Sequence, residues 1–379
     1  MSRPLAISGV VFVTAAAATG FWALRAAAPA STMREYYIAA EVAEWDYAPS
    51  GMNQVTGQPF GELENTWVGR SPDRVGRVYR KALYVEYTDS TFTTRKPRAP
   101  EWEHLGYLGP LVRAVVGDTI RVVFRNNATF PTGVHPHGVI YDKASEGALY
   151  EDGTAGPDKA DDAVPPGGTH TYVWPVPERA GPTAHETSSI VWMYHGHTVE
   201  SRDVHAGLMG PLIITRRGAA RADGTPTDVD RELVIAFAEI DENASWYIEH
   251  NVETYGSPAA KRLITFDFAD PFFISNLMPT INGFLYGHTP GLTMQVGERV
   301  RWYVFATTGF ELHAPHWHGQ TAVMNHMRTD AFGLLTMEMA VADMVPDNPG
   351  TWLFHCHVGP HNDGGMQALF TVRQQVAAR

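Results

Sequence analysis

The stretch from Trp352 to Met366 constrains this chain more than any other, because it places the single cysteine among three histidines and a methionine. It follows a Pro-Gly turn and begins with apolar and aromatic residues, which is typical of a β-strand. Side chains alternate between the two faces of a strand, so we expect His355 and His357 on one face and Cys356 on the other. One strand can therefore contribute to two separate sites.

Thiolate, imidazole and thioether groups together form the ligand set of a blue-copper centre. The residues that follow the strand could bring His361 and Met366 back to the side of Cys356. A lone cysteine in a strand is often a small buried hydrophobe, but that interpretation leaves the neighbouring histidines unexplained. Structural zinc is also a weak explanation, since zinc sites usually recruit several cysteines. A mononuclear copper site is the better interpretation.

Short strands separated by turns make up the rest of the chain. The 35 glycines and 26 prolines among 379 residues provide the turns that such a chain needs. No long segment shows helical periodicity. Strand patterns are expected at residues 83–87, 119–126, 171–176, 210–215, 232–240, 299–305, 350–357 and 367–372. We therefore expect an all-β protein built from sandwich domains.

The sequence also contains a long-range internal repeat. Residues 116–122 (VGDTIRV) are similar to residues 296–302 (VGERVRW). After these segments each half has two His-x-His groups, which are His135/His137 and His195/His197, then His316/His318 and His355/His357. The polar segment 216–230 is the expected linker. We predict two sandwich domains, at residues 31–218 and 219–379.

The two halves differ where a blue-copper site would need its ligands. Gly196 occupies the place of Cys356, and Thr132 occupies the place of His313. We therefore expect the blue-copper centre only in the second half. Eight patterned histidines remain, four from each half, and eight imidazoles where two domain faces meet can hold three further coppers.

The four histidine groups resemble the four copper signatures of multicopper oxidases in residue type, spacing and order. They read His-Pro-His-Gly, His-Gly-His, His-Ala-Pro-His-Trp-His-Gly and His-Cys-His-x3-His-x4-Met. A blue centre only in the second of two domains resembles the two-domain laccase-like members. Flanking segments at residues 36–47, 241–247 and 291–297 are similar to the ceruloplasmin and hephaestin group. The resemblance implies two cupredoxin-like Greek-key β-sandwich domains.

The resemblance also implies a role for each ligand. We expect the type 1 copper at His313, Cys356, His361 and Met366, the type 2 copper at His135 and His316, and the type 3 pair at His137, His195, His197, His318, His355 and His357. Electrons from a small reducing substrate would pass through Cys356 to His355 and His357, and O2 would be reduced to water. Tyr141, Asp142 and Glu146 follow the first signature and are candidates for a proton relay, although such residues are also common in loops.

The electron donor is predicted from three positions. Ceruloplasmin-like proteins oxidise iron(II) at acidic and histidine ligands, and the aligned positions here hold Ile274, Pro279 and Pro360. These side chains cannot coordinate a cation. We therefore expect laccase-like oxidation of phenols and aromatic amines, with ferroxidase-like metal-ion oxidation as the alternative. Other acidic residues could form a different cation site, namely Asp330, Glu338, Asp343 and Asp347.

Two other classes of protein share parts of this pattern. A copper nitrite reductase also has two cupredoxin domains. Its blue copper resembles one placed in the first domain, but this chain has Gly196 where that site would need its cysteine. A non-catalytic copper-binding or electron-relay protein needs only the type 1 ligands. Both interpretations leave most of the patterned histidines without a function.

The division of the histidines between the two halves and the net charge indicate which partners to expect. Each half carries half of the trinuclear ligand set, so two domain faces must meet, either within one chain or between chains. The resemblance to the two-domain members, in which three chains close into a ring, implies a homotrimer with trinuclear clusters at the subunit interfaces. The 29 basic and 41 acidic residues give a net charge of −12, which argues against nucleic-acid binding.

The N-terminus predicts export. Arg3 precedes an apolar stretch from Leu5 to Leu24, followed by small residues such as Ala28 and Ala30. This pattern is typical of a signal peptide within residues 1–30, but its length would also allow an uncleaved membrane anchor. In either case we expect the folded part to be periplasmic or extracellular.

Overall fold

A computed structural model describes residues 31–256, 267, 269–307, 309 and 312–374. Residues Thr32–Arg379 form one compact unit. The expected signal peptide or anchor lies outside the described residues. Among the described residues no helix has both the length and the apolar character needed to cross a membrane.

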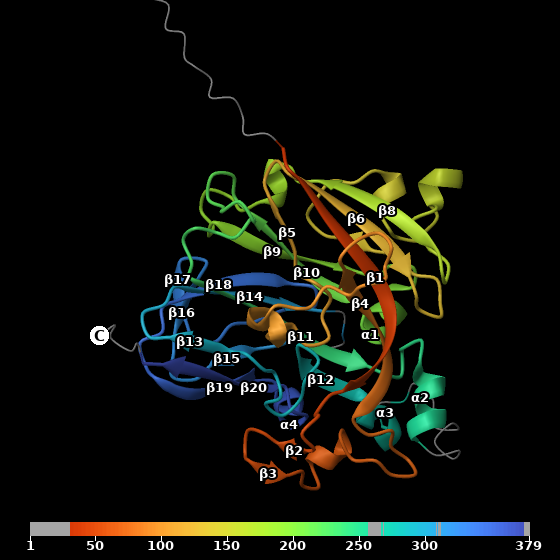
Figure 1. Ribbon diagram of the computed structural model, residues 1–379. Helices are drawn as coiled ribbons and strands as arrows, with labels where there is room; N and C mark the ends of the chain where they lie inside the picture. The colour runs from red at the N-terminus through yellow and green to blue at the C-terminus, as the bar shows by residue number, and fades with distance from the viewer. Residues whose placement is uncertain (1–30, 257–266, 268, 308, 310–311, 375–379) are drawn as a thin grey trace, which may run out of the picture. The chain divides into compact units, whose positions relative to one another are not determined.

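The first half of this unit consists of two four-stranded sheets with the orders β4–β1–β6–β8 and β5–β10–β9–β7 (Figure 1). Their inner faces share one apolar core. In β6 buried and half-buried residues alternate, because one face of the strand packs on this core. The strands are β1 (Met33–Asp46), β4 (Val78–Tyr87), β5 (Val112–Val115), β6 (Thr119–Asn126), β7 (His135–Pro136), β8 (Thr169–Pro175), β9 (Ser189–His195) and β10 (Met209–Thr215).

The second half repeats this arrangement. Its sheets have the orders β12–β11–β14–β18–β16–β17 and β13–β20–β19–β15, so the first is extended by one hairpin. β11 pairs in parallel with β14, as β1 does with β6. The strands are β11 (Arg231–Asp241), β12 (Leu277–Ile281), β13 (Thr293–Gln295), β14 (Val300–Ala306), β15 (Pro315–Trp317), β16 (Ala322–Met324), β17 (Met327–Thr329), β18 (Met339–Met344), β19 (Gly350–Cys356) and β20 (Gln367–Arg373). The predicted all-β fold of duplicated sandwiches is confirmed.

Each strand expected from the sequence is present, but the longest strand was not predicted. β1 has 14 residues and mixes glutamates with apolar residues, so it lacks a clean alternation. It is stabilised by neighbours on both sides, β4 and β6. The remaining elements are short, and the longest α-helix among the described residues has 8 residues. They are β2 (Met52–Asn53), β3 (Gln58–Pro59), α1 (Glu200–Ala206), α2 (Ile248–Tyr255), α3 (Pro271–Ser275) and α4 (Gly359–Asp363).

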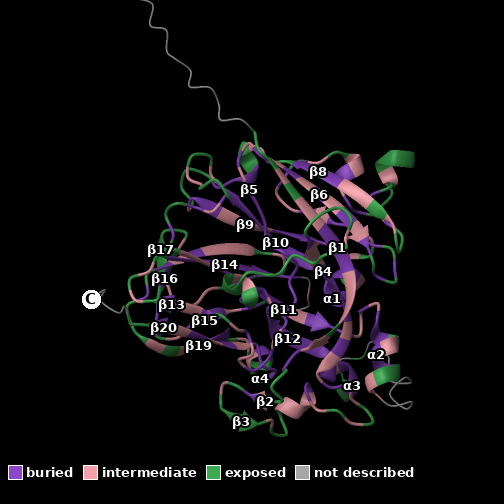
Figure 2. Cartoon of the chain, in the orientation of Figure 1, coloured by how far each residue is buried: buried purple, intermediate pink, exposed green. Residues whose placement is uncertain are grey.

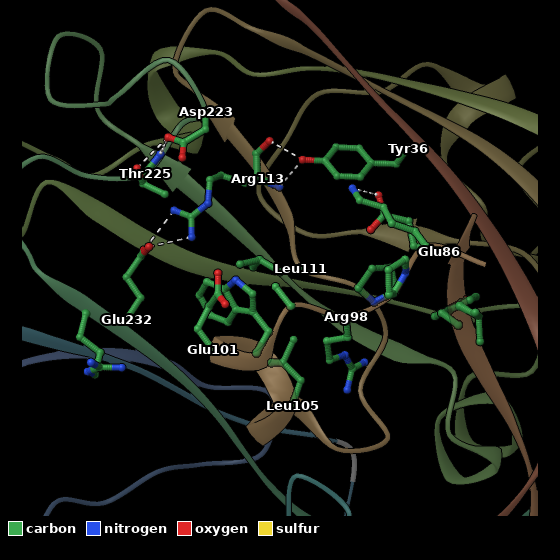
Figure 3. Close-up of a pocket in the computed structure, with 18 of the residues that line it drawn as sticks. Tyr36, Glu86, Arg98, Glu101, Leu105, Leu111, Arg113, Asp223, Thr225 and Glu232 are labelled. Carbon is green, nitrogen blue, oxygen red and sulfur yellow. Dashed lines mark hydrogen bonds and ion pairs between the residues drawn. The ribbon is translucent and has the colours of Figure 1, made fainter. Parts of the chain in front are cut away.

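An apolar core and a buried ion pair join the two halves. The core combines residues of β4, β9 and β10 with residues of β11 and β14, and every residue of β10 is buried (Figure 2). Beside it, the Arg113 guanidinium donates to both carboxylate oxygens of Glu232 at 3.0 and 2.9 Å, and the Tyr303 hydroxyl donates to the same carboxylate at 2.7 Å. The pair lies in the wall of a cavity of about 690 Å³ (Figure 3). Sequence segments from both halves therefore form one continuous interior.

Candidate metal centres

The first candidate centre is a buried cluster of one sulfur and two imidazoles. β19 ends at Cys356, and the short helix α4 returns the chain so that His361 faces the cysteine. One ligand atom each from His313, Cys356 and His361 lies within 4.8 Å of the others. The Nδ1 atom of His361 is 3.2 Å from Nδ1 of His313 and 3.7 Å from Sγ of Cys356. Converging nitrogen and sulfur lone pairs at this spacing fit a copper ion.

Backbone hydrogen bonds hold these ligands in place. His313 exchanges two bonds with Leu334, at 2.8 and 2.9 Å. Cys356 N donates to Met366 O at 3.1 Å, and Met366 N donates to His361 O at 2.9 Å. Met366 is fully buried in the same core as Cys356. The sequence-predicted type 1 residues are therefore brought together.

Two backbone amides also point at the sulfur. Ala314 N and Val358 N donate to Sγ of Cys356 at 3.3 and 3.5 Å. These hydrogen bonds fix the position of the sulfur beside the two imidazoles. Burial lowers the pKa of His313 to about 3, so its imidazole is neutral and has a lone pair for a metal.

The outer nitrogen of His361 meets an acidic residue that sequence reasoning missed. Nε2 of His361 lies 3.0 Å from Oε2 of Glu239, whose side chain is 11% exposed. Burial by itself would lower the pKa of His361, but its hydrogen bonds to Cys356 and Glu239 raise it to about 9. A signal was present, because Glu239 is the single charged residue in the apolar run of residues 233–240.

The second candidate centre is the other face of β19. His316 in β15 is the register partner of His355 in β19. Nε2 of His355 is 3.1 Å from Nε2 of His318, and Nε2 of His357 is 3.0 Å from Nδ1 of His316. The strand alternation expected from the sequence thus separates these four imidazoles from the sulfur of Cys356.

The first half brings together an equivalent set of four histidines. His135 in β7 is the register partner of His195 in β9. Nε2 atoms of His137 and His195 are 3.0 Å apart, and the rings of His135 and His197 have centroids 5.0 Å apart. Nδ1 of His135 is 2.6 Å from the Glu146 carbonyl, which directs its Nε2 towards the cluster. A cavity of about 330 Å³ opens beside this set.

The ionisation of the first-half set also suits a metal. Burial lowers the pKa of His135, His137 and His195, and that of His137 falls to about 4. These rings are therefore neutral at physiological pH, as metal ligands must be. Among the described residues, no hydrogen bond or ring contact joins this set to the four histidines of the second centre.

The proposed proton-relay residues differ in their positions. The Tyr141 ring lies 5.6 Å from the His135 ring. Asp142 is exposed, and within the described part of the chain its carboxylate makes no hydrogen bond to a histidine. The Glu146 carboxylate is bound by Lys143 at 2.6 Å. Of the three side chains, that of Tyr141 is the one in ring contact with a histidine of this set.

His205, which lies outside the four histidine groups, has a structural role. Its Nδ1 accepts a hydrogen bond from Asp241 N at 3.1 Å, and burial lowers its pKa to about 3. It lies in α1 and connects the first half to β11.

Of the three positions aligned with iron ligands, two are connected to Glu239 or to its partner His361. Pro279 in β12 is the register partner of Glu239 in β11. Pro360 in α4 directly precedes His361, and Ile274 lies in α3 before β12. The positions Pro279 and Pro360 and the missed carboxylate of Glu239 therefore belong to one region next to the sulfur-containing cluster.

Comparison with known proteins gives concordant matches. Two family models described as "Multicopper oxidase" match residues 104–219 and 256–376. Hephaestin from Homo sapiens is 41% identical over 346 residues, which are 90% of this chain and 29% of that protein. "Ferroxidase HEPHL1" from Homo sapiens is 41% identical over 344 residues, 89% of this chain and 29% of that protein. Ceruloplasmin from Homo sapiens is 37% identical, covering 90% of this chain and 32% of that protein. The chain thus spans about a third of the length of these relatives.

Solved structures agree on the fold. A crystal structure of a multicopper oxidase has a TM-score of 0.56 with 18% identity, covering 90% of each chain. The multicopper oxidase mgLAC has a TM-score of 0.57 with 18% identity, covering 92% of this chain and 88% of that chain.

Proposed function

Because this chain belongs to the multicopper oxidase family, we propose that it couples one-electron oxidation of a metal ion, iron(II) in the first instance, to the reduction of O2 to water. His313, Cys356, His361 and Met366 would hold the type 1 copper. Copper bound there and at the two histidine sets supplies the one-electron couple and the reduction of O2.

One contact carries the choice of donor, namely the 3.0 Å approach of Glu239 Oε2 to Nε2 of His361. Nδ1 of the same ring faces Cys356. A cation bound by the carboxylate would therefore be one imidazole away from the sulfur cluster. Carboxylate oxygen is also the donor type that hard cations prefer. Glu239 can thus replace the ligands that are lost at Pro279 and Pro360.

The relatives support the same choice. One of them is named a ferroxidase, and it is 41% identical to this chain. The expectation of organic donors rested on Ile274, Pro279 and Pro360, and Glu239 was not among the acidic residues considered for a different cation site. Metal-ion oxidation is now the better supported function, and phenol oxidation is the second candidate.

A specific cavity keeps the second candidate open. A cavity of about 560 Å³ is lined by Trp192, Phe332 and Val341, among others, which suits an aromatic donor. Two residues beyond Phe332, Leu334 exchanges backbone hydrogen bonds with His313. An aromatic donor in this cavity would therefore lie near the segment that holds His313, and Glu239 does not line the cavity.

The assembly that we propose is a homotrimer. Each chain has two separate sets of four histidines, and a trinuclear cluster needs both sets face to face. Three copies of this chain would also supply about the length of the relatives, of which one copy spans 29 to 32%. A closed cyclic trimer satisfies every such interface with one operator. We further propose that the chain is exported, from the apolar N-terminal pattern.

The test is O2 consumption by the fully copper-loaded protein, with iron(II) and 2,6-dimethoxyphenol compared after subtraction of iron autoxidation. We expect saturable iron(II) oxidation that exceeds phenol oxidation. Strong phenol turnover with weak iron turnover would favour the second candidate. A copper-loaded protein that consumes no O2 with any donor would refute the oxidase function.

A further inference from the structure

The first half retains the backbone of a type 1 copper site, although it lacks the ligands. Gly196 N donates to Leu208 O at 3.0 Å, just as Cys356 N donates to Met366 O at 3.1 Å. Gly196 therefore occupies the position of Cys356, and Leu208 that of Met366. The thioether and the thiolate have both been replaced by groups that cannot bind copper.

The next hydrogen bond identifies the residue at the position of the second histidine. Leu208 N donates to Asp203 O at 3.1 Å, as Met366 N donates to His361 O at 2.9 Å. Asp203 is therefore the counterpart of His361. It is fully buried in α1.

The first histidine has a counterpart as well. Thr132 forms an antiparallel bridge with Val164, as His313 does with Leu334. The Thr132 hydroxyl lies 3.4 Å from Oδ2 of Asp203, so a long hydroxyl–carboxylate contact stands where the other half has two imidazoles. All four ligand positions of the second half thus have an equivalent in the first.

The carboxylate fills the space that belongs to the thiolate in the other half. A Cβ atom at Gly196 would lie 2.7 Å from Cβ of Asp203 and 3.0 Å from its Oδ2. It would also lie 3.0 Å from the Thr132 hydroxyl. The glycine and the buried aspartate therefore fit each other, and a side chain at position 196 would displace the carboxylate.

The Asp203 carboxylate connects three segments. Oδ2 accepts hydrogen bonds from Thr198 N at 3.0 Å and Val199 N at 3.2 Å, directly after His197. Oδ1 accepts one from Trp246 Nε1 at 2.7 Å, and Trp246 belongs to the second half. In the second half, a metal bound to His313, Cys356 and His361 would make the corresponding cross-link.

We propose that Asp203 is a positioning residue that orients His197 for the trinuclear site, through the amides of Thr198 and Val199. It thereby replaces the cross-link that a metal makes in the other half. The contacts of Asp203 do not depend on the proposed function, but the expected effect on copper binding rests on it. A residue that merely capped α1 would change helix stability and leave copper binding at His197 unaltered.

The experiment uses the full chain with three substitutions. Asp203→Ala removes all the carboxylate hydrogen bonds. Asp203→Asn keeps the shape but replaces one of the two acceptor oxygens with a donor. Trp246→Phe is the matched control, because it removes only the bond to Oδ1 and leaves the Thr198 and Val199 bonds intact. Copper content is measured together with the blue absorption, the type 2 electron paramagnetic resonance signal and the type 3 near-ultraviolet absorption. The type 1 site of the same molecule serves as the internal reference.

We expect Asp203→Ala to keep the blue absorption and to bind trinuclear copper about 10- to 100-fold more weakly. Asp203→Asn should show a smaller loss, and Trp246→Phe should match the wild type. Full trinuclear copper in folded Asp203→Ala protein would overturn the proposal. If the alanine variant does not fold, Asp203→Leu replaces it as a fourth substitution and decides on the same criterion, because leucine is similar in size and cannot accept from either amide.

A second readout needs no copper. In the metal-free protein, hydrogen exchange at the Thr198 and Val199 amides should become about tenfold faster in Asp203→Ala and stay unchanged in Trp246→Phe. Unchanged exchange in the alanine variant would also overturn the proposal. A wild-type protein that binds no copper would refute the proposed function instead, and the exchange measurement would still decide the role of Asp203.

Discussion

Glu239 and Pro279 are register partners in the β11–β12 pair, so a carboxylate lies directly across from a position where the aligned iron ligand is missing. The same carboxylate is 3.0 Å from the outer nitrogen of His361. A lost ligand on one strand and a gained ligand on its neighbour occupy one small region. The proposed donor site is therefore a rearranged form of the aligned iron site.

The first prediction concerns this carboxylate. Glu239→Gln keeps the size and the hydrogen bond but removes the negative charge, so kcat/KM for iron(II) should fall about 10- to 100-fold. Turnover of 2,6-dimethoxyphenol should stay within about twofold, because Glu239 does not line its proposed cavity. Steady-state O2 consumption with both donors measures this. Equal losses with both donors would mean that Glu239 affects the sulfur cluster itself.

The second prediction concerns the homotrimer. His137→Ala and His318→Ala each remove one ligand from a different half, so each variant should be inactive alone. Co-expressed in equal amounts, they should form trimers in which about a quarter of the clusters are intact. Recovery of about a quarter of the wild-type activity would support clusters between subunits. Clusters within one chain would give no recovery.

The third prediction concerns the ion pair between the halves. The side chains of Arg113 and Glu232 are 7% and 8% exposed. Glu232→Ala leaves a buried guanidinium unpaired and should lower the free energy of unfolding by about 3–5 kcal/mol in urea denaturation of the metal-free protein. The matched control is Asp230→Ala, which breaks the exposed pair with Arg299 and should cost at most about 1 kcal/mol. Similar losses in the two variants would contradict this interpretation.

The fourth prediction concerns pH. His104 is fully buried and accepts a hydrogen bond from Val234 N at 3.0 Å. Burial lowers its pKa from 6.5 to about 4, so between these values the unfolded chain binds a proton that the folded protein does not. Stability should therefore fall as the pH drops from about 6.5 to about 4, by up to roughly 3 kcal/mol.

The control for this pH dependence is His104→Gln, which keeps an acceptor for Val234 N but does not titrate in this range. Its free energy of unfolding should change less over the same pH interval than that of the wild type. Urea unfolding of the metal-free proteins at several pH values gives the comparison. Parallel curves for the two proteins would assign the acid sensitivity to other groups.

Much of the fold and of the metal sites could be predicted because they depend on local patterns. The alternation at His355, Cys356 and His357 is a property of any strand, and the repeat of glycine turns and histidine pairs marks the two sandwiches. The contact of Glu239 with His361 could not be predicted, because it joins residues 122 positions apart in the sequence. Asp203 was missed for a related reason. Its proposed role becomes visible only when its backbone hydrogen bonds are compared with those of His361 in the other half.

The place of Cys356 in β19 has a consequence for control of the proposed reaction. Peptide bonds link it directly to His355 and His357, so an electron that reaches the sulfur has a continuous covalent path to either imidazole. No loop or domain motion is needed to complete this path, and none can easily interrupt it. A cell that needs to slow the proposed turnover would have to limit the supply of donor, oxygen or copper.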